Sequence, residues 1–257
     1  MSGPGFKYRS KQKNLIVAKY VIGDIHGGAR ALAQLMERAP LAPEDELIFL
    51  GDYLDGWSEG PQVIEALMTL SKQYSCRFIR GNHDALCLDY LKYGKAPELW
   101  VLHGGQSSID AYKSCSPEQI ERHIKFLEEL ENYIELDRKL YVHAGFSHPK
   151  GPGEEFQPHM VYWDRSLWET ARAAHQLKDE DSWQYPERLK LYSEIYIGHT
   201  PVQRIGASTP FRASNVWNID TGAAFDGPLS MINTETKAYW QSDPLPSLYP
   251  NEIGRQA

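Results

Sequence analysis

Five short apolar runs of this chain each end in polar residues that can bind a metal ion. The first run, residues 20–22, is followed by Gly23 and then by Asp24 and His26. β-Branched and aromatic residues favour strands, and a strand that breaks at glycine presents the next side chains at its carboxyl end. The other four runs lie before Asp52, before Asn82 and His83, before His143 and before His199. The pattern predicts a sheet rim that collects carboxylate, amide and imidazole groups.

Strand-like and helix-like segments alternate through the first third of the chain. We expect strands over residues 14–23, 46–50 and 76–80, because each is short, apolar and bounded by turn residues. Residues 29–38 and 61–74 have the apolar spacing of amphipathic helices. Such alternation is typical of βαβ units, in which the strands run parallel.

The middle of the chain is predicted to be mostly helical. We expect a helix over residues 84–93, a loop over residues 100–105 and a second helix over residues 117–130. Ser116 is suited to cap that second helix, because a serine oxygen accepts the free N–H groups of a first turn. A hairpin over residues 133–142 follows.

The last part of the chain is less regular. Residues 146–190 are rich in Pro, Gly and Trp, and we interpret them as an elaborated cap over the site, with a short helix at residues 165–177. Three strand-like runs follow at residues 215–219, 229–233 and 238–240, and their spacing favours an antiparallel meander. The element order fits a two-sheet sandwich with helices on its outer faces.

Both ends of the chain are polar and irregular. Residues 1–14 read as a loose leader in which residues 7–9 could begin an edge strand, and the segment from residue 243 reads as a draped or mobile tail. We expect one domain over residues 1–257, a cytoplasmic location and no membrane span. The net charge of −7 argues against binding to a nucleic-acid backbone.

The strand-end residues form a ligand set when they are taken together. Asp24 and His26 can reach one ion from extended backbone, and the carboxylate of Asp52 can bridge two. Each residue alone has a structural explanation, as a helix cap or as a core or turn histidine. The joint set suits Mn, Fe or Zn better than Mg or Ca, because it mixes oxygen with imidazole nitrogen. The six candidate ligands are Asp24, His26, Asp52, Asn82, His143 and His199.

Five motifs of the chain resemble those of the phosphoprotein phosphatase branch of the calcineurin-like metallophosphoesterases. They lie at residues 23–27, 51–55, 80–84, 143–145 and 198–201 and follow one another in the order of that branch. The resemblance implies an α/β fold, a four-layer α/β/β/α sandwich of two mixed sheets. It also implies two metal ions, with Mn favoured in vitro.

The resemblance further implies a role for each site residue. One metal would be held by Asp24, His26 and Asp52, and the other by Asp52, Asn82, His143 and His199. His83, oriented by Asp55, would be the catalytic acid. Phosphate-binding candidates are Asn82, Arg165 and Arg80, although each arginine could equally be structural.

Two positions depart from the branch. Gly56-Trp57 stands where the branch has Arg-Gly, and that arginine binds phosphate in the family. Asp84 stands where the branch usually has Glu. An aromatic side chain at residue 57 could stack on a nucleobase or on a phosphotyrosine ring.

The implied activity is phosphoester hydrolysis, by in-line attack of a hydroxide that bridges the ions. We expect a Ser/Thr, or Tyr, protein phosphatase-like phosphomonoesterase that acts on a phosphorylated protein or a small phosphoester. Alternatives are a symmetrical dinucleoside tetraphosphate hydrolase, another small-molecule phosphoesterase, and a catalytically impaired phospho-binding regulatory module. The sequence leaves the oligomeric state open.

Overall fold

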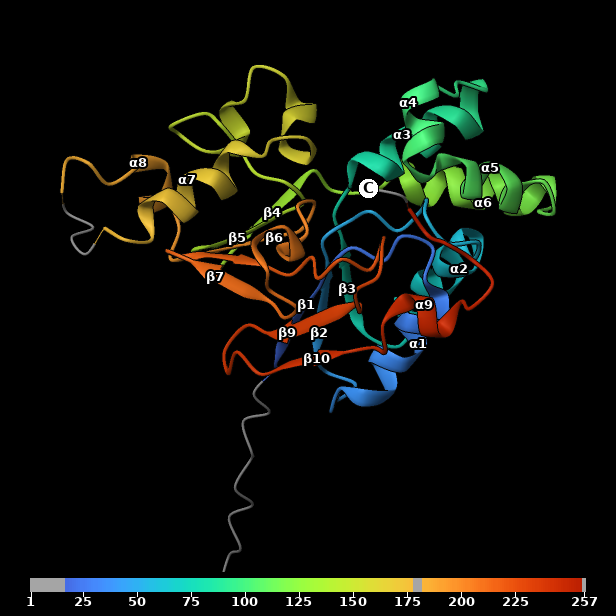
Figure 1. Cartoon of the computed structure of the whole chain (residues 1–257), viewed down its shortest axis with the longest axis horizontal. Helices are drawn as coiled ribbons and strands as arrows, with labels where there is room; N and C mark the ends of the chain where they lie inside the picture. The colour runs from blue at the N-terminus through green and yellow to red at the C-terminus, as the bar shows by residue number, and fades with distance from the viewer. Residues whose placement is uncertain (1–16, 178–181, 256–257) are drawn as a thin grey trace, which may run out of the picture.

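The computed structural model describes residues 17–177 and 182–255. Its centre is a pair of five-stranded sheets that face each other, with helices on the outer sides (Figure 1). The first sheet has the order β10-β9-β1-β2-β3 and the second the order β4-β5-β6-β8-β7. Each sheet contains parallel and antiparallel pairs, so both are mixed. The predicted four-layer α/β/β/α sandwich is confirmed.

The strands are three or four residues long. Those of the first sheet are β1 (Lys19–Ile22), β2 (Glu46–Phe49), β3 (Ser75–Phe78), β9 (Ser230–Asn233) and β10 (Tyr239–Gln241). Those of the second sheet are β4 (Tyr133–Leu136), β5 (Lys139–Val142), β6 (Glu194–Ile197), β7 (Phe211–Ala213) and β8 (Val216–Asn218). The predicted hairpin over residues 133–142 is confirmed by the antiparallel β4–β5 pair.

The direction of the strands brings the predicted ligands to one rim. β1 pairs in parallel with β2, and β2 with β3, so the residues that follow these strands leave the sheet on the same side. In the second sheet β6 runs parallel to both β5 and β8. A buried apolar layer joins the two sheets, in which the rings of Tyr141 and Tyr196 stack with centroids 5.2 Å apart.

Helices cover the outer face of each sheet (Figure 1). Against the first sheet lie α1 (Ala29–Arg38), α2 (Gly60–Leu70), α3 (Asn82–Tyr93) and α6 (Pro117–Glu128). The second sheet is covered by α7 (Ser166–Ala174) and α8 (Glu187–Lys190). As predicted, Ser116 caps α6, and its hydroxyl oxygen accepts a bond from the backbone N–H of Gln119.

The predicted loop over residues 100–105 is wrong in part. Two helices, α4 (Glu98–Trp100) and α5 (Gln106–Tyr112), flank a tight turn (Val101–Gly105) in which His103 and Gly104 leave the helical conformation. Gly104 has φ +108° and bends the chain there. Burial of the Trp100 and Tyr112 side chains against the first sheet's helices stabilises the helical path, which the two glycines obscure in the sequence.

The predicted meander is also wrong in part. β9 and β10 form an antiparallel hairpin, but β8 belongs to the other sheet, where it pairs with β6 and with β7. The connection from β8 to β9 spans residues 219–229, which is too long for a hairpin turn, and it carries the chain from the second sheet to the first.

Residues 146–190 contain α7 and α8, which pack on the outer face of the second sheet, and two residues that face the site, Trp163 and Arg165. The cap role of this segment stays a prediction. The C-terminal segment includes α9 (Leu245–Leu248) and is draped on the first sheet's helices. The strand expected at residues 7–9 lies outside the described residues, and among those described no helix is long and apolar enough to cross a bilayer.

Candidate active site

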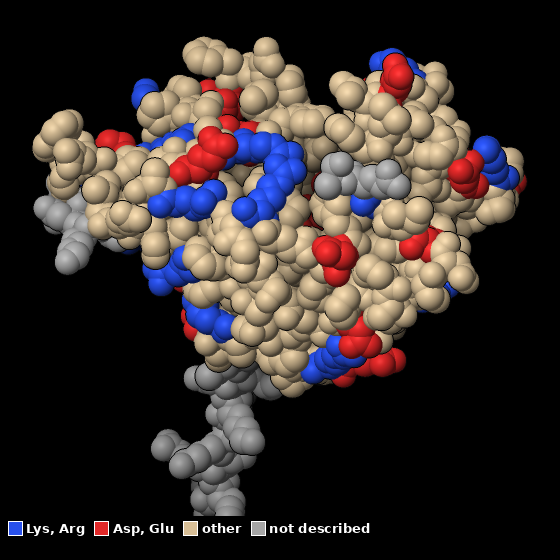
Figure 2. Space-filling model, in the orientation of Figure 1, with Lys and Arg blue, Asp and Glu red and all other residues tan. Residues whose placement is uncertain are grey.

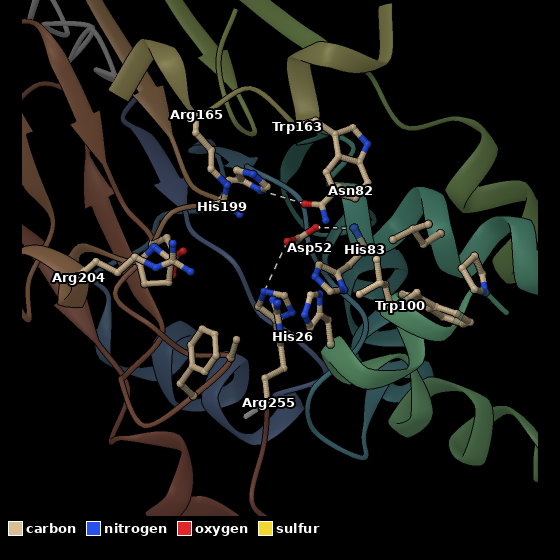
Figure 3. A pocket seen from close by; sticks show the side chains of 18 residues that line it. His26, Asp52, Asn82, His83, Trp100, Trp163, Arg165, His199, Arg204 and Arg255 are labelled. Atoms are coloured by element: carbon tan, nitrogen blue, oxygen red, sulfur yellow. Dashed lines mark hydrogen bonds and ion pairs between the residues drawn. The ribbon is translucent and has the colours of Figure 1, made fainter. Parts of the chain in front are cut away.

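A pocket opens at the rim where the two sheets meet (Figure 3). Six residues predicted from the sequence line it: His26, Asp52, Asn82, His83, Arg165 and His199. Three more lie buried near it in contact with this set: Asp24, Asp55 and His143. Residues that are far apart in the chain therefore meet as the strand pattern predicts.

The loops after the strands hold several site residues in left-handed backbone. Positive φ angles occur at His26 (50°), Asp52 (52°), Asp55 (69°) and His199 (66°). This region is unfavourable for residues other than glycine and costs on the order of 1–3 kcal/mol at each position. The extended backbone expected for Asp24 and His26 is therefore wrong, because His26 has a positive φ.

Asp52 lies between two imidazoles. Its Oδ2 is 3.5 Å from Nε2 of His26 and 3.3 Å from Nε2 of His143. Nε2 of His26 is in turn 4.0 Å from Oδ2 of Asp24. A carboxylate in this position can serve two adjacent ions.

Around Nε2 of His143, hydrogen-bond acceptors outnumber the donors. Nδ1 of His143 donates to the carbonyl oxygen of Leu50 at 2.8 Å, which leaves Nε2 facing Oδ2 of Asp52 and, at 3.2 Å, Oδ1 of Asn82. Nδ1 of His199 lies 2.9 Å from the same Asn82 oxygen. Because the proton of His143 lies on Nδ1, the Nε2 lone pair points at two acceptor oxygens, which requires a cation or an added proton between them. The donor set therefore fits metal ions.

Unpartnered buried atoms support the same conclusion. Oδ1 of Asp24, Nδ1 of His26 and Nε2 of His199 are buried and have no hydrogen-bond partner. Leaving such groups unpaired costs about 1–3 kcal/mol each. Among the described residues, two groups have ligand atoms close enough for one ion, His26 with Asp52 and His83, and Asp52 with His143 and His199.

Burial and neighbouring charges shift the pKa values of the site residues. Burial would raise the pKa of Asp52, but the neighbouring imidazoles of His143 and His83 hold it well below its usual range. Burial would lower the pKa of His143, yet the Asp52 carboxylate raises it to about 10. Asp24, buried and close to Asp220, has a raised pKa. Bound cations would compensate these buried carboxylates.

His83 and Asp55 form a hydrogen-bonded pair. Nδ1 of His83 is 2.7 Å from Oδ2 of Asp55, and the fully buried Asp55 also accepts from Nε1 of Trp100 at 2.5 Å and from Oγ of Ser108 at 2.6 Å. Nδ1 of His83 therefore carries the proton, and its other ring nitrogen is free for the pocket. The contacts of Trp100 and Ser108 with Asp55 could not be predicted from a sequence in which residues 100–105 read as a loop.

Asp84 organises the loop that carries Asp52. Its carboxylate accepts from the backbone N–H groups of Asp52 (2.8 Å), Tyr53 (2.8 Å) and Gly81 (2.9 Å). Burial, followed by repulsion from Asp52, raises its pKa to about 7. Although the family usually has Glu at this position, Asp84 also provides a carboxylate, and this group bonds to the loop of Asp52 and to the loop before Asn82.

The two candidate phosphate arginines lie in different places. Arg165 lines the pocket, and its Nη1 donates to Oγ1 of Thr200 at 3.0 Å. Burial and the nearby Arg204 and Arg255 lower its pKa. Arg80 instead donates from Nη2 to three carbonyl oxygens at the end of α6, on Leu127, Glu128 and Leu130. That helix-capping position removes Arg80 from the phosphate-binding set.

Trp57 does not face the pocket either. It is 1% exposed, stacks on Tyr249 with ring centroids 5.1 Å apart, and donates from Nε1 to the carbonyl oxygen of Ala223. The expectation that it stacks on a substrate ring is wrong, because the C-terminal segment covers it.

The lining of the pocket also includes Trp163, Arg204, Asp220 and Arg255, which were not among the predicted site residues. Burial raises the pKa of Asp220 to about 6. Basic side chains gather beside a hollow in the face of Figure 2, between the lobe with α7 and the lobe with α3 to α6. No motif marks Arg204, Asp220 or Arg255, since these residues come together only in the folded chain.

The chain was compared with known proteins. Residues 20–218 match the family model of the calcineurin-like phosphoesterases. An asymmetrical bis(5'-nucleosyl)-tetraphosphatase PrpE from Geobacillus sp. strain WCH70 is 27% identical over 226 residues, which cover 82% of this chain and 87% of that protein. Serine/threonine-protein phosphatase 2 from Escherichia coli K12 is 27% identical over 213 residues, with 82% and 90% covered.

Solved structures share the fold. A putative diadenosine tetraphosphatase superimposes with a TM-score of 0.59 at 18% identity, covering 89% of this chain and 94% of that one. A yeast serine/threonine phosphatase with similarity to human PP5 gives a TM-score of 0.55 at 13% identity, covering 88% and 80%. At these identities the likeness concerns the fold alone.

Proposed function

The chain belongs to the calcineurin-like phosphoesterase family and is a metal-dependent phosphoester hydrolase, and we propose that it dephosphorylates Ser/Thr or Tyr phosphomonoesters. The observation that carries this proposal is the combination of two features in one pocket. An acceptor-rich cluster around Asp52 suits metal ions, and a hydrogen-bonded Asp55–His83 pair lies beside it. Dephosphorylation needs both, one to activate water and one to protonate the leaving group.

The proposed ligands are divided between the two sheets. Asp24, His26 and Asp52 would hold one ion, and Asp52 would share the second with Asn82, His143 and His199. When bound, the ions supply a Lewis acid for the phosphoryl group and lower the pKa of water to about 7. We propose Mn, Fe or Zn on the chemistry of the donors, with Mn favoured in vitro.

The remaining chemistry falls to side chains. Because Asp55 fixes the proton on Nδ1 of His83, the imidazole can carry its second proton on Nε2 and donate it to the leaving oxygen. Trp100 and Ser108 hold Asp55 in place from α4 and α5. Asn82 and Arg165 are proposed to orient the phosphoryl oxygens through their N–H groups.

A second candidate substrate is a dinucleoside tetraphosphate. A second groove adjoins the pocket and shares Pro201, Arg204, Phe225 and Arg255 with it, then runs on to Pro246 and Ile253. Ile253 is 75% exposed, so this groove has an apolar wall that could receive a nucleoside. The relatives named as tetraphosphatases are asymmetrical enzymes, not the symmetrical type that the resemblance implied.

A substrate panel tests the proposal. The purified chain is loaded with Mn and given p-nitrophenyl phosphate, phosphoserine, phosphothreonine and phosphotyrosine peptides, and diadenosine tetraphosphate, with a chelated sample as control. We expect metal-dependent release of phosphate, fastest with phosphopeptides of one type. Faster cleavage of the tetraphosphate into mono- and triphosphate would select the second candidate. A protein that binds Mn but cleaves nothing would contradict both and support the regulatory module.

The proposal also covers the domain organisation and the location of the protein. We propose a single phosphoesterase domain with residues 146–190 as its cap, acting in the cytoplasm on a phosphorylated protein or a small phosphoester. The motif order from Asp24 to His199 supports one domain, since both sheets contribute ligands to the same pocket.

A further inference from the structure

Arg255 is a basic side chain of the pocket that comes from the C-terminal segment. Arg255 lines the pocket, its buried Nε has no hydrogen-bond partner, and no carboxylate in the described chain forms an ion pair with it. Its guanidinium lies 5.2 Å over the ring of Phe225, which supports it without neutralising it. A partly buried arginine without an anion is costly, so the arrangement suits an anionic ligand.

The guanidinium lies on the metal side of the pocket. Figure 3 shows Arg255 extending toward His26, which lines the same pocket. Arg165 lines the pocket as well, with Asp52 and the predicted metal ligands between them (Figure 3). An anion bound beside Asp52 would thus meet positive charge on two sides.

The loop after Asp55 leaves room for this side chain. Gly56 has φ +101°, and a Cβ atom on it would lie 3.2 Å from the carbonyl oxygen of His26 and 3.5 Å from Cγ of Arg255. A Cβ on Gly104 would lie 2.8 Å from the same Cγ. Gly104 therefore keeps open the space that the aliphatic part of Arg255 occupies, and Gly56 lies in contact with it.

The same loop anchors the segment that carries Arg255. Trp57 stacks on Tyr249, whose hydroxyl donates to Glu59 at 2.5 Å. Glu252 accepts from the backbone N–H and the hydroxyl of Ser58, at 3.0 and 2.7 Å. In Figure 1 the red C-terminal segment runs from α9 back to the site. Gly56 lies in contact with Arg255 and Trp57 secures the segment that carries it, so both departures from the family pattern lie against the C-terminal segment.

We infer that Arg255, brought in by the C-terminal segment, binds the phosphoryl group of the substrate opposite Arg165. This inference rests on the proposed phosphoester hydrolysis and adds a binding residue to it. It also explains why the position after Asp55 can be a glycine, because the positive charge comes from a distant part of the chain.

Phosphate binding tests the inference without turnover. Calorimetric titration of the Mn-loaded protein with inorganic phosphate is compared for the wild type, Arg255→Gln and Arg255→Lys, with Arg172→Gln on the exposed face of α7 as matched control. Loss of a charge-assisted bond predicts phosphate binding weaker by about 10- to 100-fold in Arg255→Gln. Arg255→Lys should recover part of this loss, and Arg172→Gln should bind as the wild type does.

Turnover and metal content complete the test. For p-nitrophenyl phosphate, kcat/KM of Arg255→Gln should fall with phosphate affinity, while its metal content and Tm stay at wild-type values. Ser58→Ala, which loosens the anchor, should weaken phosphate binding less but in the same direction. Unchanged phosphate binding in Arg255→Gln, or a loss of metal that accounts for the weaker binding, would overturn the inference. Phosphate binding that depends on Arg255 in a protein without any hydrolase activity would contradict the proposed function alone.

Discussion

The first sheet presents a mixed set of ligands at the shared rim, Asp24, His26, Asp52 and Asn82, and this set is called the first side. The second sheet presents only imidazoles, those of His143 and His199, and these form the second side. Residues on the first side are held by their own loops, as Asp84 shows by accepting three backbone N–H bonds there. The second side depends on the first for its orientation.

Two bonds between the sides show this dependence. Nδ1 of His143 donates to the carbonyl oxygen of Leu50, and the backbone N–H of His199 donates to Asp24 at 2.9 Å. The second side is therefore oriented in part by groups of the first side. Damage to the first side should cost both ions, and damage to the second side should cost one.

The largest effect is expected for Asp52→Asn. Asp52 contacts the imidazoles of both metal groups, so the loss of its charge should empty both sites and lower turnover by about 10³-fold or more. Metal analysis and p-nitrophenyl phosphate assays on the same sample measure both. Retention of one ion would contradict the expected loss of both, because it would show that Asp52 serves a single metal site.

His83→Asn should reduce turnover by about 10²- to 10⁴-fold on alkyl phosphates and much less on aryl phosphates, whose leaving groups need no proton. Metal content should stay unchanged. His83 lies within reach of the His26 and Asp52 ligand atoms, so this variant also decides between two roles. Loss of one ion, or equal slowing of both substrate types, would show that His83 is a ligand.

His143→Asn tests the second side. We expect one ion to be lost and turnover to fall by about 100-fold at low Mn, with partial recovery as Mn is added, because the first side still holds its ion. Mn titration against activity and metal stoichiometry measures this. Loss of both ions would show that the two sides are not separable.

Trp100→Phe removes one of the bonds that hold Asp55 and keeps an aromatic ring in the same space. We expect turnover on alkyl phosphates to fall by about 10-fold, since Ser108 still holds the carboxylate. Aryl phosphates should be less affected, as for His83→Asn. Equal loss on both types would indicate that Trp100 shapes the pocket and does not act through Asp55.

Glu194→Gln tests the second sheet away from the site, because Glu194 begins β6 and His199 follows the other end of that strand. Burial would raise the pKa of Glu194, but hydrogen bonds from Lys237 and Tyr196 hold it below its usual value. Its ionised form thus stabilises the fold above about pH 4.3, and this contribution disappears as the pH falls through the lowered pKa.

The variant should be less stable than the wild type at pH 7 by at most about 1 kcal/mol, and the two should converge in acid. Urea unfolding at several pH values measures the difference, and turnover should not change. A variant with reduced turnover would show that the base of the second sheet is coupled to the site.

Much of the site follows from the sequence because parallel strands share a rim. The runs before Asp24, Asp52 and Asn82 are recognisable as strands, and their carboxyl ends must then lie together. The helix over residues 29–38 is predicted with the bounds that α1 has, because its apolar spacing is regular and Pro40 stops it soon after.

The remaining features depend on contacts between distant parts of the chain. β8 reads as a strand, but nothing local shows that it joins the second sheet. Trp100 and Ser108 reach Asp55 only because a helical path with a glycine bend replaces the expected loop. Arg255 is about 200 residues from Gly56 in sequence, and the two meet because Trp57 stacks on Tyr249 and Ser58 bonds to Glu252.

Crystals of the Mn-loaded protein, with data collected at the Mn absorption edge, test the central claim most directly. The account predicts two anomalous peaks in the pocket, both next to Asp52, one on the side of His26 and the other on the side of His143 and His199. A single peak, or peaks away from Asp52, would contradict a site shared between the two sheets.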